Sequence, residues 1–186
     1  WIKKESAISA NYKAFLVNRV GDVGLLLGLC LVLLSYSTTD YNQIFEIKNS
    51  IDMDRIDIFG YSFHALSAIC MLLFIGAMAK SAQVPLQFWL PDSMEGPTPI
   101  SALIHAATMV TAGIYMVARL SPLYELTDGV LIFILYIGSI TAFFLGLVAL
   151  VQNDIKRIIA YSTISLFKRF DIWRLIWSGI LLRIFT

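Results

Sequence analysis

Long apolar runs alternate with short polar segments along this chain of 186 residues. Residues 58–79, 96–118 and 129–153 contain no Asp, Glu, Lys or Arg. Each run is long enough for a helix that crosses a bilayer, which needs about 20 residues. The pattern therefore predicts a protein of the all-α class, a polytopic transmembrane helix bundle.

The apolar segments predict about four spans followed by the start of a fifth helix. The spans are placed at residues 15–35, 58–84, 98–120 and 129–151, and the fifth helix begins near residue 154. These elements make residues 1–165 one transmembrane region. Residues 166–186 form a divergent tail with apolar residues at helical spacing. This pattern is typical of an amphipathic helix in the membrane interface, and a short transmembrane span is the alternative.

A helix break is expected near Lys80–Pro85 in the second span. A continuous helix from Ile58 to Leu90 would be about 50 Å long at about 1.5 Å per residue, whereas the apolar core of a bilayer is about 30 Å thick. Pro85 is the expected cause, because proline removes a backbone donor and clashes with the preceding turn. The carbonyl groups freed near Ser81 are expected to find partners in water or in neighbouring polar groups.

Composition supports a membrane protein and excludes other classes. Hydrophobic residues make up 58% of the chain and charged residues 15%, which is unusual for a soluble domain. The sequence has no basic stripe with interleaved aromatic residues, so the expected partner is the lipid bilayer and no nucleic acid. The chain starts with Trp1 rather than Met, and we expect an internal fragment of a longer subunit.

Lys80 carries the sharpest chemical signal in the sequence. An ammonium group is costly in hydrocarbon, and charges within a membrane commonly mark paths of ions or protons. One interpretation is that Lys80 is a buried amine that loads and releases a proton. The alternative is that it extends from a helix end to the lipid headgroups. A helix that continues beyond Lys80 to a break at Pro85 favours the first interpretation.

Four further residues are candidates for a proton relay. His105 lies about two turns into the third predicted span, where its imidazole either passes protons or makes a hydrogen bond between helices. Thr108 and Thr111 lie on the same or an adjacent sector, and they either hold water or pack against another helix. Lys156 takes part only if the fifth helix carries it into the bundle, and its alternative role is to set topology.

The polar connections hold acids but no recognisable cofactor or metal site. Asp92 and Glu95 are expected to cap the third span or to pair with cations. The sequence contains no metal-ligand cluster, nucleotide-binding loop, nucleophile triad or CxxC motif. We therefore expect no cofactor and no metal on this chain.

Several motifs resemble those of one family of membrane proteins. They are KAFLVNRVGD at 13–22, AKSAQ at 79–83, WLPDSMEGPTP at 89–99, ISALIHAATMV at 100–110, QNDIKR at 152–157 and AYST at 160–163. On these motifs, residues 11–165 resemble the subunit 5 family of the proton-pumping NADH:ubiquinone oxidoreductase (respiratory complex I), mitochondrial type. The block from Lys80 to Val110 is long and specific.

The resemblance implies an antiporter-like subunit that takes part in proton translocation coupled to NADH-to-quinone electron transfer. Lys80 falls on the family's central lysine, and His105 falls on a histidine of its hydrophilic axis. Flavin, iron–sulfur clusters and quinone are expected on other subunits. The implied partners are the other membrane-arm subunits, and the implied location is the mitochondrial inner membrane or, alternatively, the bacterial plasma membrane.

The chain also departs from the family pattern. The glutamate that partners the family's central lysine is expected upstream of Trp1, a later helix with a paired His/Lys motif is missing, and the residues after Ser165 diverge. A separate chain is therefore expected to supply the missing parts. Two alternatives stay open: the large subunit of a multisubunit sodium/proton antiporter, and a structural membrane anchor that supports assembly without carrying protons.

Overall fold

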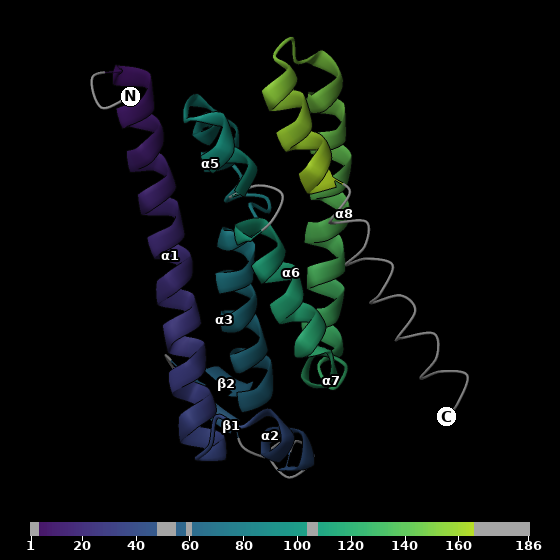
Figure 1. Cartoon of the computed structure of the whole chain (residues 1–186). Coiled ribbons are helices and arrows are strands. Elements are labelled where there is room, and N and C mark those ends of the chain that lie inside the picture. Colours follow the sequence, from purple (N-terminus) through teal and green to yellow (C-terminus); the bar gives the residue numbers. More distant parts are fainter. Residues whose placement is uncertain (1–3, 48–54, 59–60, 104–107, 166–186) are drawn as a thin grey trace.

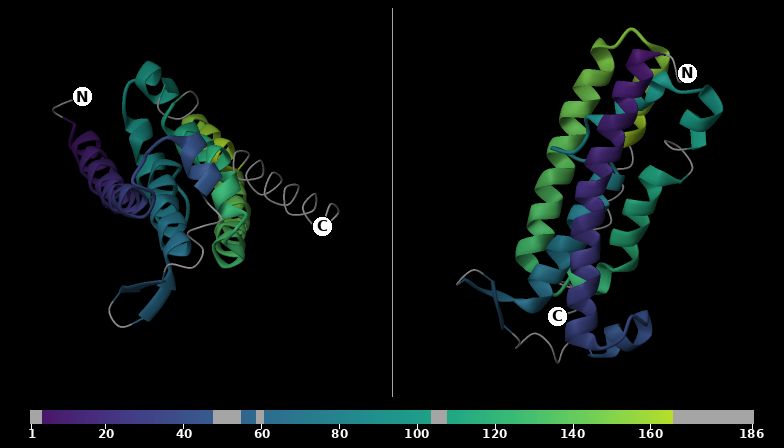
Figure 2. Two further views of the ribbon diagram at one scale, coloured as in Figure 1. Left: turned by 90° about the horizontal axis from the view of Figure 1, so that it is seen from below. Right: turned by 90° about the vertical axis from the view of Figure 1, so that its left-hand side faces the viewer.

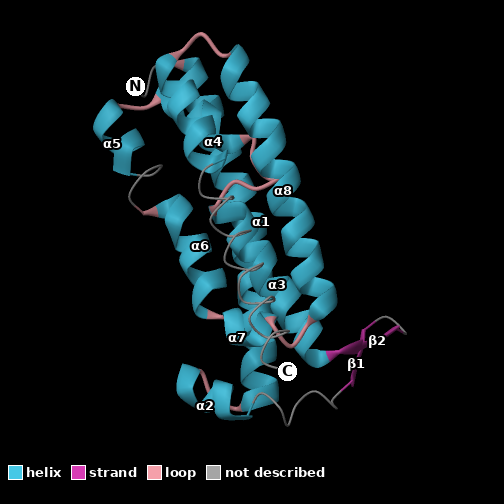
Figure 3. Cartoon of the chain, turned by 90° about the vertical axis from the view of Figure 1, so that its right-hand side faces the viewer, coloured by secondary structure: helices cyan, strands magenta, loops and turns pink. Residues whose placement is uncertain are grey.

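The protein is a bundle of helices in a computed structural model that describes residues 4–47, 55–58, 61–103 and 108–165 (Figure 1). The longer helices run along the bundle in alternating directions: α1 (Glu5–Tyr36), α3 (Ala65–Lys80), α6 (Met109–Arg119) and α8 (Asp128–Val151). The shorter elements are α2 (Tyr41–Ile47), β1 (Arg55–Ile58), β2 (Tyr61–His64), α4 (Trp89–Asp92), η1 (Ser93–Glu95), α5 (Thr98–Ala102) and α7 (Ser121–Tyr124). The predicted helical transmembrane bundle is confirmed, with a short two-stranded hairpin added at one end (Figure 3).

Within the part of the chain that the structure describes, two helices have the length and composition of membrane spans. They are α1 and α8, whereas α3 and α6 are shorter apolar helices. Large apolar side chains stand on the outer faces of the long helices, for example Leu34 (79% exposed) and Leu150 (82% exposed). A monomeric soluble protein rarely exposes wide apolar patches. These outer faces therefore fit contact with lipid.

Helix α3 forms the centre of the bundle, and α1 packs along it (Figure 2). The α3 residues Leu66, Ile69 and Phe74 are at most 1% exposed. Glycines at positions 21, 24 and 28 follow one face of α1, and a Cβ built on them would lie 2.2, 2.9 and 3.0 Å from α3 side chains. Small residues at such positions let two backbones approach closely in lipid. This stripe therefore sets the short distance between α1 and α3.

The second predicted span is wrong at its beginning. Helix α3 begins at Ala65 rather than at residue 58, because the preceding residues pair as antiparallel strands, with Arg55 opposite His64 and Ile58 opposite Tyr61. Apolar and polar residues alternate in both strands, and a period of two favours strands over a helix. The lack of Asp, Glu, Lys and Arg after residue 57 fits a helix as well as a strand. The alternation of apolar and polar residues favours the strand.

The predicted helix break is confirmed, but its cause lies before Pro85. Helix α3 ends at Lys80, the N–H of Gln83 donates to the carbonyl of Met78 (3.0 Å), and the N–H of Ala82 donates to that of Ala79 (3.3 Å). Position 82 has a left-handed backbone, with φ of 49°. These features make a Schellman motif, which ends a helix by capping its last carbonyls.

The remaining predicted boundaries differ in detail from the structure. Helix α1 begins at Glu5 rather than at residue 15. The predicted span 98–120 is divided between α5 and α6, and residues 104–107 lie outside the described residues. A helical stretch covers residues 155–165, where the fifth helix is predicted from residue 154. The tail 166–186 also lies outside the described residues, so the division at residue 165 stays a prediction.

Candidate functional site

A lysine and an aspartate from two helices form an ion pair within the bundle. Lys80 Nζ lies 2.7 Å from Asp22 Oδ1, and the side chains are 33% and 32% exposed. Asp22 is near the middle of α1, about 26 Å from its first residue at about 1.5 Å per residue. Arg19 Nη1 lies 3.8 Å from the other oxygen of the same carboxylate. The site is therefore one carboxylate between two cations, within a helix long enough to cross a bilayer.

The structure gives Lys80 a carboxylate neighbour within this chain, Asp22, which the sequence pattern does not identify as its partner. The glutamate that the resemblance implies upstream of Trp1 stays a prediction. A signal for Asp22 exists in the sequence, because a carboxylate in a largely apolar helix needs a partner. The way α1 packs along α3 decides that this partner is Lys80. The sequence pattern does not reveal how the two helices are aligned.

Polar side chains satisfy the backbone groups at the break beside Lys80. Trp89 Nε1 donates a hydrogen bond to the Ala79 carbonyl at 3.1 Å. Ser81 Oγ donates to the Val110 carbonyl of α6 at 2.8 Å. The expectation that groups near the break find polar partners is confirmed. These bonds fix the end of α3, and with it the residue that carries the ammonium group.

Helix α8 supports the same break from another side. Thr141 is fully buried, and its Oγ1 accepts a hydrogen bond from the Val84 N–H at 3.3 Å. The same hydroxyl donates to the Ile137 carbonyl of its own helix at 2.5 Å. One threonine hydroxyl therefore ties the non-helical segment to α8.

Two cavities adjoin the ion pair. The first, called the Asp22 cavity, has a volume of about 310 Å³, and Asn11, Asn18 and Ser93 line it together with Asp22. The second, called the Lys80 cavity, has a volume of about 360 Å³, and Leu25, Ala77, Ala112 and Met116 line it together with Lys80. Both linings are mainly apolar, and the lining on the side of the carboxylate holds more polar side chains than the lining on the side of the ammonium.

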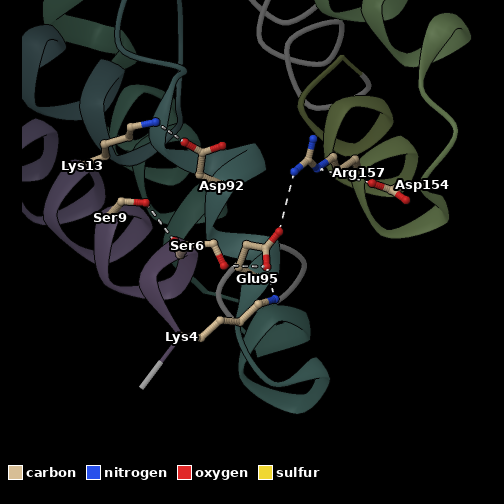
Figure 4. A network of polar contacts seen from close by, with 8 residues as sticks. All are labelled: Lys4, Ser6, Ser9, Lys13, Asp92, Glu95, Asp154 and Arg157. Carbon is tan, nitrogen blue, oxygen red and sulfur yellow. Dashed lines mark hydrogen bonds and ion pairs between the residues drawn. The ribbon is translucent and has the colours of Figure 1, made fainter. Parts of the chain in front are cut away.

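Ion pairs hold the loop after the break at the end of the bundle where α1 begins (Figure 4). Lys13 Nζ lies 2.7 Å from Asp92 Oδ2, and Lys4 Nζ lies 2.5 Å from Glu95 Oε2. Arg157 Nη2 lies 3.7 Å from Glu95 Oε1. The hydrogen bond from Lys4, and then its positive charge, hold the pKa of Glu95 below its ordinary value. The expected pairing of both acids with cations is confirmed.

Of the other predicted site residues, the structure describes Thr108, Thr111 and Lys156. His105 lies outside the described residues. Thr108 is exposed and donates to the Leu103 carbonyl at 3.1 Å, and Thr111 donates to the Thr108 carbonyl at 3.0 Å. Lys156 is exposed and lines a cavity of about 470 Å³ beside the loop ion pairs. The roles assigned to these four residues stay predictions.

The described residues offer no obvious set of metal ligands. Within residues 4–47, 55–58, 61–103 and 108–165, no three His, Cys, Asp or Glu side chains are placed to hold a metal ion. Cys30 and Cys70 are both free thiols.

Comparisons with known proteins agree with the resemblance drawn from the motifs. Residues 1–167 match the family described as "NADH:quinone oxidoreductase/Mrp antiporter, TM".

The NADH-quinone oxidoreductase subunit L of Neisseria meningitidis serogroup A is 54% identical over 167 residues, which is 89% of this chain and 25% of the relative. The NADH-ubiquinone oxidoreductase chain 5 of Marchantia polymorpha is 50% identical over 167 residues, with the same two shares. The subunit L of Rhodobacter capsulatus is 51% identical over 165 residues, 89% of this chain and 23% of the relative. The chain thus spans about a quarter of the length of these relatives.

Proposed function

The chain belongs to the NADH:quinone oxidoreductase/Mrp antiporter transmembrane family, and from that membership we propose that it is a membrane-arm subunit of NADH:quinone oxidoreductase that takes part in proton translocation. Identities of 54% and 50% to a subunit L and a chain 5 support the redox-coupled branch of the family. The subunit itself performs no redox step, and its part in the enzyme is to move protons.

The observation that carries the proposal is the ion pair between Lys80 and Asp22 at 2.7 Å, directly at the end of a broken helix. Ionisable residues within membrane helices are functional by default, because their desolvation has to be offset by a partner. The opposite charges of the two groups stabilise each other while they are in contact. Opening and closing of the pair is therefore the proposed switch that releases and loads the proton.

The other candidates take secondary roles in this proposal. His105 is the relay that receives protons next along the third span, and Thr108 and Thr111 hold water near it. Lys156 is exposed at the end of the bundle, and it takes part only as a relay at the surface. These roles follow from residue type and position along the chain.

The proposed partners are the other membrane-arm subunits and a polypeptide that supplies the remainder of the subunit, since the chain spans about a quarter of the relatives' length. Flavin, iron–sulfur clusters and quinone belong to other subunits of the complex. The membrane is the mitochondrial inner membrane or a bacterial plasma membrane, and relatives of both kinds, chain 5 and subunit L, support a membrane that houses NADH oxidation.

Replacement of the lysine tests the proposal. In the assembled complex, Lys80→Met removes the ammonium group and keeps the length of the side chain. We expect proton uptake driven by NADH oxidation in membrane vesicles to be abolished. Lys13→Met is the matched control, because it breaks an ion pair of the same 2.7 Å length at the loop rather than within the bundle. A normal number of protons moved per NADH oxidised in the Lys80→Met complex would contradict the proposal.

A sodium/proton antiporter subunit is the second candidate, because the family description names antiporters as well. The same vesicles distinguish the two functions. Proton movement driven by a sodium gradient, without NADH and without co-purifying flavin or iron–sulfur subunits, would support the antiporter. A third candidate, a structural anchor, would be supported if Lys80→Met left all transport intact while deletion of the chain prevented assembly.

A further inference from the structure

Two glycines hold the last turn of α3 from two sides. On one side, Gly21 of α1 lies against Ala79. On the other side, a Cβ built on Gly113 of α6 would lie 2.2 Å from Ser81 Oγ and 2.7 Å from the carbonyl oxygen of Ala77. Real Cβ atoms essentially never come within 3.0 Å of another heavy atom. Position 113 therefore has to be glycine for α6 to approach the end of α3 this closely.

Ser81 uses the space beside Gly113 to bond to α6. Its hydroxyl donates to the Val110 carbonyl at 2.8 Å, and Ser81 and Val110 are each 1% exposed. The N–H of Ser81 donates to the Ala77 carbonyl at 2.9 Å. The residue that ends α3 is thus bonded both to its own helix and to α6. A methyl group at position 113 would displace the Ser81 hydroxyl from its acceptor.

Lys80 lies between the two glycine contacts. Helix α3 packs against both α1 and α6 (Figure 1). Successive residues of a helix are about 100° apart around its axis, so Ala79 and Ser81 lie on nearly opposite sides of α3 and Lys80 projects between them. Residues of α1 and of α6 accordingly line the Lys80 cavity together. The ammonium meets Asp22 on the α1 side of this space at 2.7 Å.

We propose that Gly113 is a positioning residue that directs Lys80 toward Asp22. Close packing on both sides of the turn resists displacement of its backbone, so the side chain alone approaches or leaves the carboxylate. Without the contact at Gly113, Ser81 loses its bond to α6 and the last turn of α3 shifts relative to α1. The proposal rests on the proton-carrying function of the ion pair and adds a residue, on a third helix, that sets the geometry of the pair.

Cross-linking in the assembled complex tests the position of Lys80 without reliance on pumping. A hydrophobic carbodiimide activates a carboxylate, and an amine in direct contact with it displaces the urea and leaves an amide bond, which mass spectrometry of this chain detects. We expect an amide between Asp22 and Lys80 in the parent, because the two side chains lie 2.7 Å apart. Gly113→Ala should lower the yield of this amide by about threefold or more, because overpacking forces shifts of the backbone.

Two controls separate positioning from a general loosening of the bundle. Gly28→Ala also overpacks α1 against α3, since a Cβ there would lie 3.0 Å from the Leu73 side chain. Position 28 is about 9 Å along α1 from Asp22 at about 1.5 Å per residue, so this variant should leave the yield of the Asp22–Lys80 amide nearly unchanged. The amide between Lys13 and Asp92, an ion pair of the same 2.7 Å length at the loop, should form equally in every variant.

Ser81→Ala removes the hydroxyl without adding volume, and it should lower the same yield if Gly113→Ala prevents assembly. An unchanged yield in Gly113→Ala, or in Ser81→Ala where the first variant does not assemble, would overturn the positioning role. An equal fall in Gly28→Ala would overturn it as well. If the yield falls as expected but Lys80→Met pumps normally, the proton-carrying function fails while the positioning of Lys80 by Gly113 stands.

Discussion

Gly21 of α1 packs against Ala79 of α3 so closely that a Cβ built on Gly21 would lie 2.2 Å from the Cβ of Ala79. Each of these residues directly precedes a member of the ion pair, Asp22 and Lys80. The contact therefore sets the distance between the two helices at the level of the pair. The ion pair therefore depends on glycine at position 21, which has no side chain to hold the two helices apart.

We expect Gly21→Ala to push α1 away from α3 and to lengthen the Asp22–Lys80 contact. Overpacking of this kind costs about 1–3 kcal/mol, so the thermal midpoint of the solubilised protein should fall and coupled proton uptake should decrease. Gly129→Ala is the control, because a Cβ at Gly129 meets nothing within 4 Å. Unchanged stability and pumping in Gly21→Ala would show that the helices adjust without loss of the pair.

Asp22→Asn tests the carboxylate of the pair. The amide keeps the size of the side chain but leaves the ammonium of Lys80 without this counter-charge, and an ammonium within a membrane protein needs such a partner. We expect coupled proton uptake to fall severalfold and Asp22→Glu to restore a large part of it. Asp92→Asn breaks a pair of the same 2.7 Å length at the loop and should pump almost normally. Equal pumping by the asparagine and glutamate variants at position 22 would show that proton movement does not require a negative charge there.

Much of the fold follows from the sequence, because long uncharged apolar runs have few structures available in a bilayer. The break beside Lys80 also follows from helix length. The pattern does not reveal that Ala82 adopts a left-handed backbone and ends α3 before Pro85, since alanine carries no signal for this conformation. The hairpin before Ala65 is not predicted, because an uncharged run after residue 57 also fits a helix and each strand holds only four residues.

The site follows from the sequence only in part. Lys80 is identifiable as a costly charge in an apolar run, whereas the assignment of its partner requires the packing of α1 on α3. Thr141 gives no signal at all, because a threonine in an apolar helix is ordinary and its contact with Val84 depends on how α8 meets the break. Residues that act by position between helices are therefore invisible to local patterns.

Thr141→Val tests whether α8 stabilises the break. Valine has nearly the same shape but no hydroxyl, so the N–H of Val84 loses its acceptor. A buried donor without a partner costs about 1–3 kcal/mol. We expect a lower thermal midpoint of the solubilised protein and reduced pumping, whereas Thr141→Ser keeps the hydroxyl and should remain close to the parent. A valine variant as stable as the parent would mean that another group satisfies this N–H.

Acid should weaken the attachment of the loop through Glu95. Because Lys4 lowers its pKa in the folded protein, this carboxylate stabilises the fold at pH values above the unfolded pKa of about 4.3, and the contribution is lost as the pH falls through the lower folded pKa. Glu95→Gln lacks the contribution at every pH. The parent should therefore be more stable than Glu95→Gln at pH 7, and the difference in thermal midpoint should shrink steadily below about pH 4.3. Glu46→Gln, at an exposed glutamate of α2, controls for the loss of one negative charge. A difference that stays constant down to pH 3 would show that the ion pair with Lys4 does not contribute to stability.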